Sequence, residues 1–336
     1  MKKFLVKFLV LFALADSILL YYALIVYPKL SGDMGYMQQI EFGAEYMDSI
    51  QELYCPSVLK VHSLQNVDSI NKTVITIGDS FSHFKEYGYS QKVADLLNTD
   101  IIDISVSESG PIQTFVQYVN NNLFPKNSIV IIESVERFLI KRLQQVDILD
   151  SQMPQIQKYT YVITDRDKPA IKQDYLIGTF KYVREKMHIR NCNLIHYYDT
   201  DRKLFTHSNT HDGVYIYGED FNFKGSFVCN YAEVYSKLYA LHQLANDHQI
   251  NLIFIVAADK YDVYEPFIIE EHLKNPTLDS IPNEEWIVNT KPLLQNAVYS
   301  GIKDVYYIND THWSPVGSKI VGEEVANRIR KLYLNY

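Results

Sequence analysis

The chain has 336 residues, of which 47% are hydrophobic and 21% charged, and its formal net charge is −8. That much apolar side chain, with only 13 Gly and 11 Pro, excludes intrinsic disorder and suits one large domain or at most two. The acidic balance argues against nucleic acid as a partner, because nucleic-acid binders need a basic face for phosphates. The 27 tyrosines suit either a surface that contacts carbohydrate or a tyrosine-rich core.

An apolar run at residues 8–27 follows three lysines and contains Asp16 as its one charged residue. Such a run is long enough to span a bilayer as a helix, and its positive flank predicts that the rest of the chain is exported. Residues 13–15 (ALA) also resemble a signal-peptide cleavage site. We expect residues 1–30 to be an uncleaved signal anchor rather than a removed signal peptide, because the run continues well past Asp16. The remaining chain is then extracytoplasmic, on the periplasmic or cell-surface side.

The cysteines and histidines do not indicate a metal centre. Cys55, Cys192 and Cys229 have neither metal-ligand spacing nor the even count of a disulfide framework, although a bridge between Cys192 and Cys229 and three buried thiols both remain open. His207 and His211 are four residues apart without a carboxylate or thiol at a telling spacing. We therefore expect no metal and no cofactor.

After a predicted linker with short helices at residues 31–70, strand and helix patterns alternate. This alternation predicts a parallel sheet covered by helices on both faces, which is a three-layer α/β/α sandwich with five strands. The catalytic domain would cover residues 71–336, with a loosely patterned insertion at about 139–230. The expected strands are 73–77, 101–106, 128–132, 252–257 and 305–308, and the expected helices are 91–97, 112–123, 231–248 and 316–332.

Two motifs follow the first and last expected strands. Ser80 lies in GDSFS, and Asp310 and His312 lie in DTHW. In parallel sheets, ligand sites lie beyond the carboxyl ends of the strands, so the fold would bring both motifs together. A serine hydroxyl becomes a nucleophile when a base lies within hydrogen-bond reach and a carboxylate orients that base. The sequence therefore predicts Ser80 as nucleophile, His312 as base and Asp310 as its orienting carboxylate, with the backbone N–H of Ser80 facing an oxyanion.

With these motifs, residues 72–330 resemble the SGNH (GDSL-type) hydrolase superfamily, in particular the branch similar to alginate O-acetyltransferases. The matching segments are GDSFS, DTHWSPVGS and ADKYDVY at residues 258–264. The resemblance implies a flavodoxin-like sheet in which Ser80 carries an acetyl group and passes it to a polysaccharide hydroxyl. It also implies that Gly110, in the superfamily's second block, supplies an oxyanion N–H beside that of Ser80.

The chain departs from that pattern in two places. The third block, which usually carries an Asn donor, reads ESVER at residues 133–137, with the Glu and Arg of the acetyltransferase branch. In the alginate enzymes the Asp-x-His motif precedes the serine, whereas here Ser80 comes first. The resemblance therefore implies a differently connected relative.

Five further residues are candidates for binding substrate. Arg137 would bind a sugar carboxylate or the acetyl donor, or else pair with a neighbouring glutamate. Lys260, Tyr261 and Tyr264 would form a substrate wall or simply pack a loop. Trp313 would stack on a sugar ring or cover the triad.

Three functions are open at this point. The leading one is an O-acetyltransferase that acts on a cell-surface or exported polysaccharide through an acetyl-serine, with an acetyl-ester donor and a multi-pass membrane acyltransferase as partner. The second is a carbohydrate esterase or deacetylase that uses the same triad with water as acceptor. The third is a non-catalytic subunit for polysaccharide binding or assembly.

Overall fold

The computed structural model describes residues 2–21, 74–82, 88–99, 101–104, 106, 110–152, 195–206, 212–220, 231–270, 278–282 and 284–334. The predicted linker at 31–70, the three cysteines and much of the segment at 139–230 lie outside the described residues. The same holds for His207 and His211.

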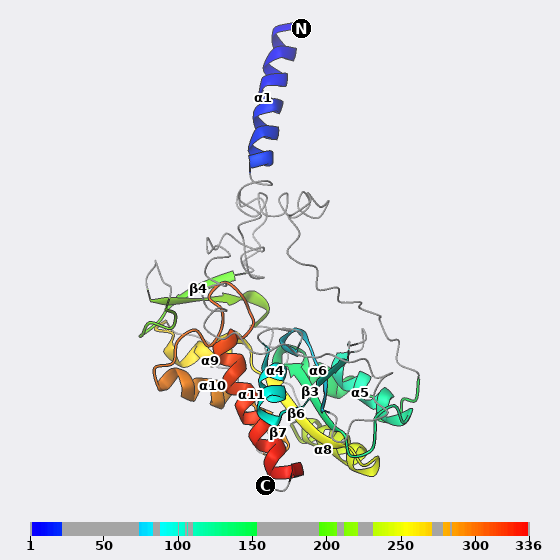
Figure 1. The fold of residues 1–336 in the computed structure, drawn as a ribbon. Helices are drawn as coiled ribbons and strands as arrows, with labels where there is room; N and C mark the ends of the chain where they lie inside the picture. Colours follow the sequence, from blue (N-terminus) through cyan, green and yellow to red (C-terminus); the bar gives the residue numbers. More distant parts are fainter. Residues whose placement is uncertain are drawn as a thin grey trace.

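A five-stranded parallel sheet forms the centre of the domain (Figure 1). Its spatial order is β2-β1-β3-β6-β7, which is the flavodoxin-like order with a switch point between β1 and β3. The inner strands are continuous apolar runs because both faces of the sheet are covered. The predicted parallel sheet is thus confirmed. Its strands are β1 (Val74–Ile77), β2 (Ile101–Ile104), β3 (Ile129–Val135), β6 (Asn251–Ala257) and β7 (Ile287–Asn289).

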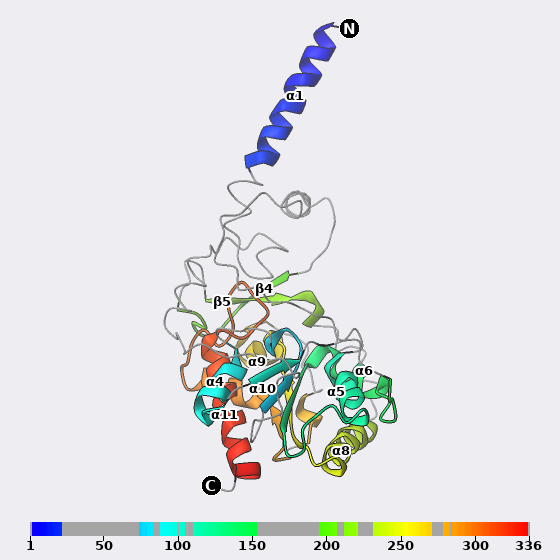
Figure 2. The same cartoon turned by 45° about the vertical axis from the view of Figure 1, so that its right-hand side comes forward.

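Helices form a layer on each side of this sheet, as the turned view in Figure 2 also shows. One layer is α4 (Tyr89–Leu97), α10 (Thr290–Tyr299) and α11 (Pro315–Ile329), and the other is α5 (Gly110–Asn120), α6 (Glu136–Gln145) and α8 (Tyr231–Asp247). The remaining elements are short. They are the hairpin of β4 (Ile195–Asp199) and β5 (Gly213–Tyr217), α9 (Lys260–Tyr264), the 3₁₀ turns η4 (Ser80–Ser82), η6 (Glu265–Phe267) and η7 (Leu278–Ser280), and the π-helical turn η8 (Arg330–Leu334).

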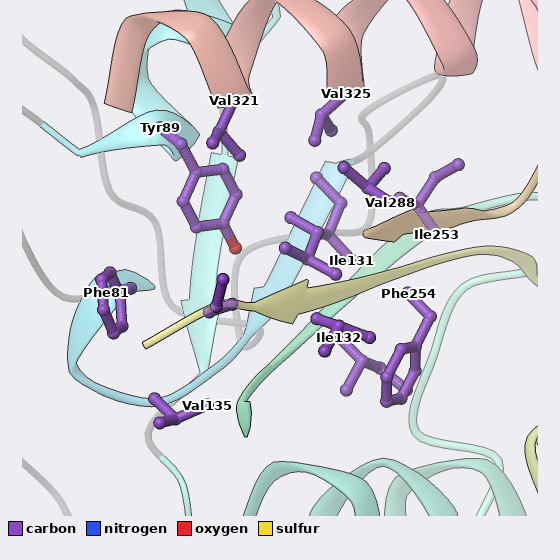
Figure 3. Packing of buried hydrophobic residues seen from close by; sticks show 14 of the residues in the cluster. Phe81, Tyr89, Ile131, Ile132, Val135, Ile253, Phe254, Val288, Val321 and Val325 are labelled. Carbon is purple, nitrogen blue, oxygen red and sulfur yellow. The ribbon is translucent and has the colours of Figure 1, made fainter. Parts of the chain in front are cut away.

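The core lies between the sheet and the two helical layers (Figure 3). Ile131 and Ile253 point toward Val321 and Val325 of α11, whereas the next residues of both strands point to the opposite face. This alternation is the period of two expected for strands buried on both sides. Because neighbouring strands pair in parallel, their carboxyl ends lie together at one edge of the sheet.

The predicted fifth strand at residues 305–308 is wrong. Tyr306 makes only an isolated antiparallel bridge with Trp313, and the Tyr307 N–H donates to the His312 carbonyl at 3.2 Å. The segment therefore folds back on its own loop rather than joining the sheet. The edge strand is β7, whose three residues are too short to stand out as a strand pattern.

The structure also shows α6 and α10, which the sequence patterns did not indicate. Helix α6 starts at the residue after β3 ends, so no turn residue marks the boundary. Leu139 and Leu143 lie one helical turn apart on its buried face. Residues 139–145, expected in an insertion, thus belong to a helix that packs against β3 and α8.

The N-terminal helix α1 covers Lys2–Tyr21 and exposes apolar side chains, among them Phe4 and Leu11. Among the described residues, no helix is both long and apolar enough to cross a membrane. The transmembrane helix predicted within residues 1–30 is therefore not found in the described part of the chain. The last part of the predicted run, residues 22–27, lies outside the described residues.

Candidate active site

Ser80 begins the 3₁₀ turn η4, three residues beyond the end of β1. The turn is closed by the Ser82 N–H, which donates to the Asp79 carbonyl at 3.0 Å. Ser80 is exposed, whereas Phe81 and Ser82 are buried beneath it. The turn therefore presents the Ser80 hydroxyl to solvent at the switch point of the sheet.

Ser80, His312 and Asp310 form a continuous hydrogen-bonded series. The Ser80 Oγ lies 2.6 Å from His312 Nε2, and His312 Nδ1 lies 2.5 Å from Asp310 Oδ1. The backbone N–H of His312 also donates to this oxygen of Asp310 at 3.0 Å. With its Nδ1 proton donated to Asp310, the imidazole leaves its Nε2 lone pair to accept the Ser80 proton. The fold thus brings together the three residues predicted as the triad.

Asp79, the residue before the serine, is anchored from β3 and α6. The Arg142 guanidinium donates to both carboxylate oxygens of Asp79, at 2.5 and 2.8 Å, and to Ser134 Oγ at 2.9 Å. The Val135 N–H donates to Asp79 Oδ2 at 2.9 Å. Bidentate arginine pairs fix geometry as well as charge, so Arg142 sets the course of the chain into the Ser80 turn.

Gly110, the predicted oxyanion donor, is the first residue of α5. It has a φ of 85°, and a Cβ added here would fall 2.8 Å from Arg142 Nε. Glycine is therefore required both by the backbone conformation and by the close approach of Arg142. Through Arg142 and Asp79, the N-terminus of α5 is packed next to the Ser80 turn. Residues 107–109, which precede Gly110, lie outside the described residues.

A buried carboxyl lies beneath the Ser80 turn. Glu133 Oε2 accepts from Ser82 Oγ at 3.0 Å, and Ser82 Oγ lies 2.9 Å from the Tyr89 hydroxyl. Burial, and then the charge of Asp79, raise the pKa of Glu133 well above its usual range. Its other oxygen has no hydrogen-bond partner within the described part of the chain. Glu133 therefore supports the Ser80 turn from inside, through its hydrogen bond with Ser82.

Trp313 lies behind the triad and does not line an open site. It is 2% exposed, its ring centroid lies 4.4 Å from that of Phe81, and its Nε1–H donates to the Tyr306 hydroxyl at 2.9 Å. The Phe81 ring in turn lies 5.0 Å from the His312 imidazole. A sugar cannot reach the faces of a ring buried in this way, so the packing alternative holds for Trp313.

The predicted substrate wall is also turned inward. Lys260, Tyr261 and Tyr264 are fully buried in the five-residue helix α9. The Tyr264 hydroxyl accepts from the Tyr306 N–H at 3.1 Å, and Lys260 Nζ donates to backbone carbonyls of the loop that carries His312. The expectation that these side chains contact substrate is therefore corrected, because a segment leaving a buried central strand packs its side chains against neighbouring loops.

Arg137 forms ion pairs, although not with the glutamates expected. Its guanidinium contacts Asp220 and lies 2.8 Å from Asp259 Oδ1, and its side chain is 12% exposed. Burial raises the pKa of Asp220 and of Asp259, while the charge of Arg137 opposes this rise. Arg137 thus ties the segment after β5 to the end of β6, and sits below the surface of the site.

Three carboxyl groups next to this ion pair lie close enough to share a cation. One ligand oxygen each from Glu136, Asp259 and Asp262 lies within 4.8 Å of the others, and all three residues are buried. Burial, followed by the charges of Asp262 and Asp259, raises the pKa of Glu136 well above its usual range. A raised pKa means that protons neutralise part of this cluster.

Arg142 and Asp220 are the site residues that sequence reasoning missed. Both lie in the segment expected to be an insertion, and neither has a motif around it. Only the position of α6 next to β3 shows that Arg142 reaches Asp79, the residue before Ser80.

Comparison with known proteins returns no match to a family model, to a curated protein or to a solved structure.

Proposed function

We propose that this chain is an SGNH-type O-acyltransferase that carries an acetyl group on Ser80 and passes it to a hydroxyl of an exported polysaccharide. The observation that carries the proposal is the series from the exposed Ser80 hydroxyl through His312 to Asp310, at 2.6 and 2.5 Å. The 2.6 Å distance from Ser80 Oγ to His312 Nε2 is within the range of hydrogen bonds that transfer protons.

In the first half-reaction, the Ser80 Oγ attacks the carbonyl carbon of an acetyl ester while its proton moves to His312 Nε2. Asp310 stabilises the imidazolium that forms. The tetrahedral intermediate then collapses, the bond to the donor oxygen breaks, and His312 returns the proton to that oxygen. The donor alcohol leaves, and Ser80 holds the acetyl group as an ester.

In the second half-reaction, a sugar hydroxyl takes the place of the donor alcohol. His312 accepts its proton, the sugar oxygen attacks the acetyl-serine carbonyl, and the Ser80 Oγ leaves with the proton from His312. In this proposal, the backbone N–H groups of Ser80 and Gly110 stabilise the negative charge that develops on the carbonyl oxygen. Atoms balance, because one ester is consumed and one is formed.

The choice of polysaccharide as acceptor rests on the sequence motifs, above all GDSFS, DTHWSPVGS and the ESVER block. The lysine-flanked apolar segment at residues 1–30 supports a site outside the cytoplasm. Acetyl esters must then be supplied there, so we propose a multi-pass membrane acyltransferase as the source of the donor.

The first test is labelling by a fluorescent fluorophosphonate, which reacts with activated serines. We expect the full chain to be labelled, and Ser80→Ala and His312→Gln each to abolish labelling. Ser300→Ala is the control, since this exposed serine donates to the Asn296 carbonyl of its own helix turn at 2.8 Å. Labelling that persists in Ser80→Ala would refute the proposal.

Hydrolysis is the second candidate activity, because Ser80 is exposed to solvent. A second experiment separates it from transfer. The full chain is incubated with an acetyl-ester donor and a panel of neutral and uronic-acid oligosaccharides. Mass increases of one acetyl group on a sugar support the transferase. Free acetate with every acceptor identifies an esterase instead.

A further inference from the structure

A buried lysine side chain contacts, from inside the domain, the loop that carries Asp310 and His312. The loop leaves the Tyr306–Trp313 bridge and is closed by the bond from the Tyr307 N–H to the His312 carbonyl, at 3.2 Å. Between these points the chain has no helix or strand, so its carbonyl groups need donors from elsewhere.

Lys260 supplies those donors. Its Nζ donates to the carbonyl oxygens of Tyr307 at 2.7 Å, of Ile308 at 3.0 Å and of Asp310 at 3.3 Å. An ammonium group has three N–H bonds, so one side chain satisfies three carbonyls of the same loop. Lys260 is 0% exposed, and its position directly after β6 is fixed by the central sheet.

Burying an ammonium group is costly, and a loop that only needed filling would be served by an apolar side chain. What the ammonium adds is geometry, because three carbonyls that converge on one nitrogen allow the backbone a single course. That course includes Asp310, whose Oδ1 holds both His312 Nδ1 and the His312 N–H, at 2.5 and 3.0 Å. One hydrogen bond thus links Lys260 to Asp310, and a second links Asp310 to His312.

We propose that Lys260 is a positioning residue that sets the Asp310–His312 pair in register with Ser80, a role that rests on the acyl-transfer function proposed for these three residues. Lys260 touches no reacting atom. It acts through the loop backbone, where a displacement of about 1 Å is enough to lower the rate of catalysis roughly 10²-fold.

The test compares Lys260→Met, which keeps the length of the side chain and removes its donors, with Lys237→Met. Lys237, which lies on α8, is the matched control. Its Nζ also donates to a backbone carbonyl, that of Val146, at 3.2 Å. With p-nitrophenyl acetate and the full chain, we expect kcat to fall roughly 10²-fold in Lys260→Met with little change in KM. Lys237→Met should behave as the wild type.

Two further readouts separate positioning from general support of the fold. Loosening Asp310 weakens the carboxylate's preference for the protonated imidazole, so the acid limb of the kcat/KM profile should move to lower pH. The deshielded Nδ1–H proton resonance of His312, assigned by its loss in His312→Gln, should disappear or move upfield in Lys260→Met. Lys260→Gln, which keeps an amide donor, should lie between Met and wild type, and replaces Lys260→Met if that variant does not fold.

A folded Lys260→Met with wild-type kcat, pH profile and proton resonance would overturn the proposal. This result is distinct from a failure of the proposed function. In that case Ser80→Ala would keep its activity and labelling, while the His312 resonance would still report whether Lys260 holds the loop.

Discussion

Gly78 shows how little room the nucleophile turn leaves at the scale of single residues. A Cβ added here would fall 1.9 Å from Ser82 Oγ and 2.7 Å from Glu133 Oε2. Both atoms belong to buried side chains that hydrogen-bond each other, so neither can move without leaving a buried polar group unpaired.

We therefore expect Gly78→Ala to lower the free energy of unfolding by about 1–3 kcal/mol and to slow fluorophosphonate labelling of Ser80. Urea denaturation and the labelling rate measure the two effects. Gly301→Ala is the control. Its φ of 85° also disfavours alanine, but nothing lies within 4 Å of the added Cβ, so labelling should stay unchanged. Equal labelling rates in the two variants would contradict this account of the turn.

At this scale, the sequence predicted the residues whose chemistry is recognisable in a short motif. Ser80, Asp310 and His312 follow from two motifs at the ends of expected strands. Trp313 belongs to one of these motifs and Lys260 to the ADKYDVY segment, yet both side chains are buried. A motif does not tell a contact with substrate from a contact with the protein. The bidentate hold of Arg142 on Asp79 depends on tertiary packing alone.

At the scale of elements, helix α11 fixes one end of the loop that carries the base. Ser314 is its N-cap, with an Oγ that accepts from the Val316 N–H at 2.9 Å and donates to the Asp304 carbonyl. The capping residue Ser314 thus also ends the loop, two residues after His312. Ser314 itself is fully buried.

We expect Ser314→Ala to cost about 1–2 kcal/mol of stability and also to slow labelling of Ser80, because the loop loses its fixed end. Asn289→Ala is the matched control, since Asn289 caps α10 by accepting from the Lys291 N–H at 3.1 Å. It should lower the melting temperature by a comparable amount and leave the labelling rate unchanged. If Ser314→Ala is destabilised but reacts at the wild-type rate, the cap does not position the loop.

The elements that the sequence predicted correctly are those with a long apolar run or a clear helical period. The inner strands β1, β3 and β6 are of this kind. The edge strand was expected at 305–308 but is the three-residue β7. The apolar pattern at 305–308 was misleading because burial alone does not distinguish a strand from a loop that folds back on itself. Helix α6 was missed because no turn separates it from β3.

At the scale of the whole molecule, buried carboxyl groups make stability depend on pH. Burial, and then Asp262 and Asp259, raise the pKa of Glu136 above its ordinary value of 4.5. The unfolded chain then releases this proton near pH 4.5, while the folded chain keeps it to higher pH. The folded state binds more protons in that window, so its stability falls as pH rises through it.

We expect Glu136→Gln to remove this loss. Between pH 4.5 and the folded pKa of Glu136, the free energy of unfolding of the variant should gain on the wild type by about 1.4 kcal/mol per pH unit. Urea denaturation at a series of pH values measures the difference. Glu285→Gln is the control, because the Glu285 side chain is 59% exposed. Parallel curves for wild type and Glu136→Gln would show that this carboxyl is ionised in the folded protein.

The serine and its base are 232 positions apart in the chain. Contacts of such long range slow folding, because the intervening chain must be ordered before His312 reaches Ser80. We therefore expect Ser80 to be unreactive toward fluorophosphonate in a chain still being synthesised and in any fragment that ends before His312. A pulse of fluorophosphonate during refolding would count only those molecules in which both ends of the domain have met, whereas circular dichroism also counts helices that have formed without them.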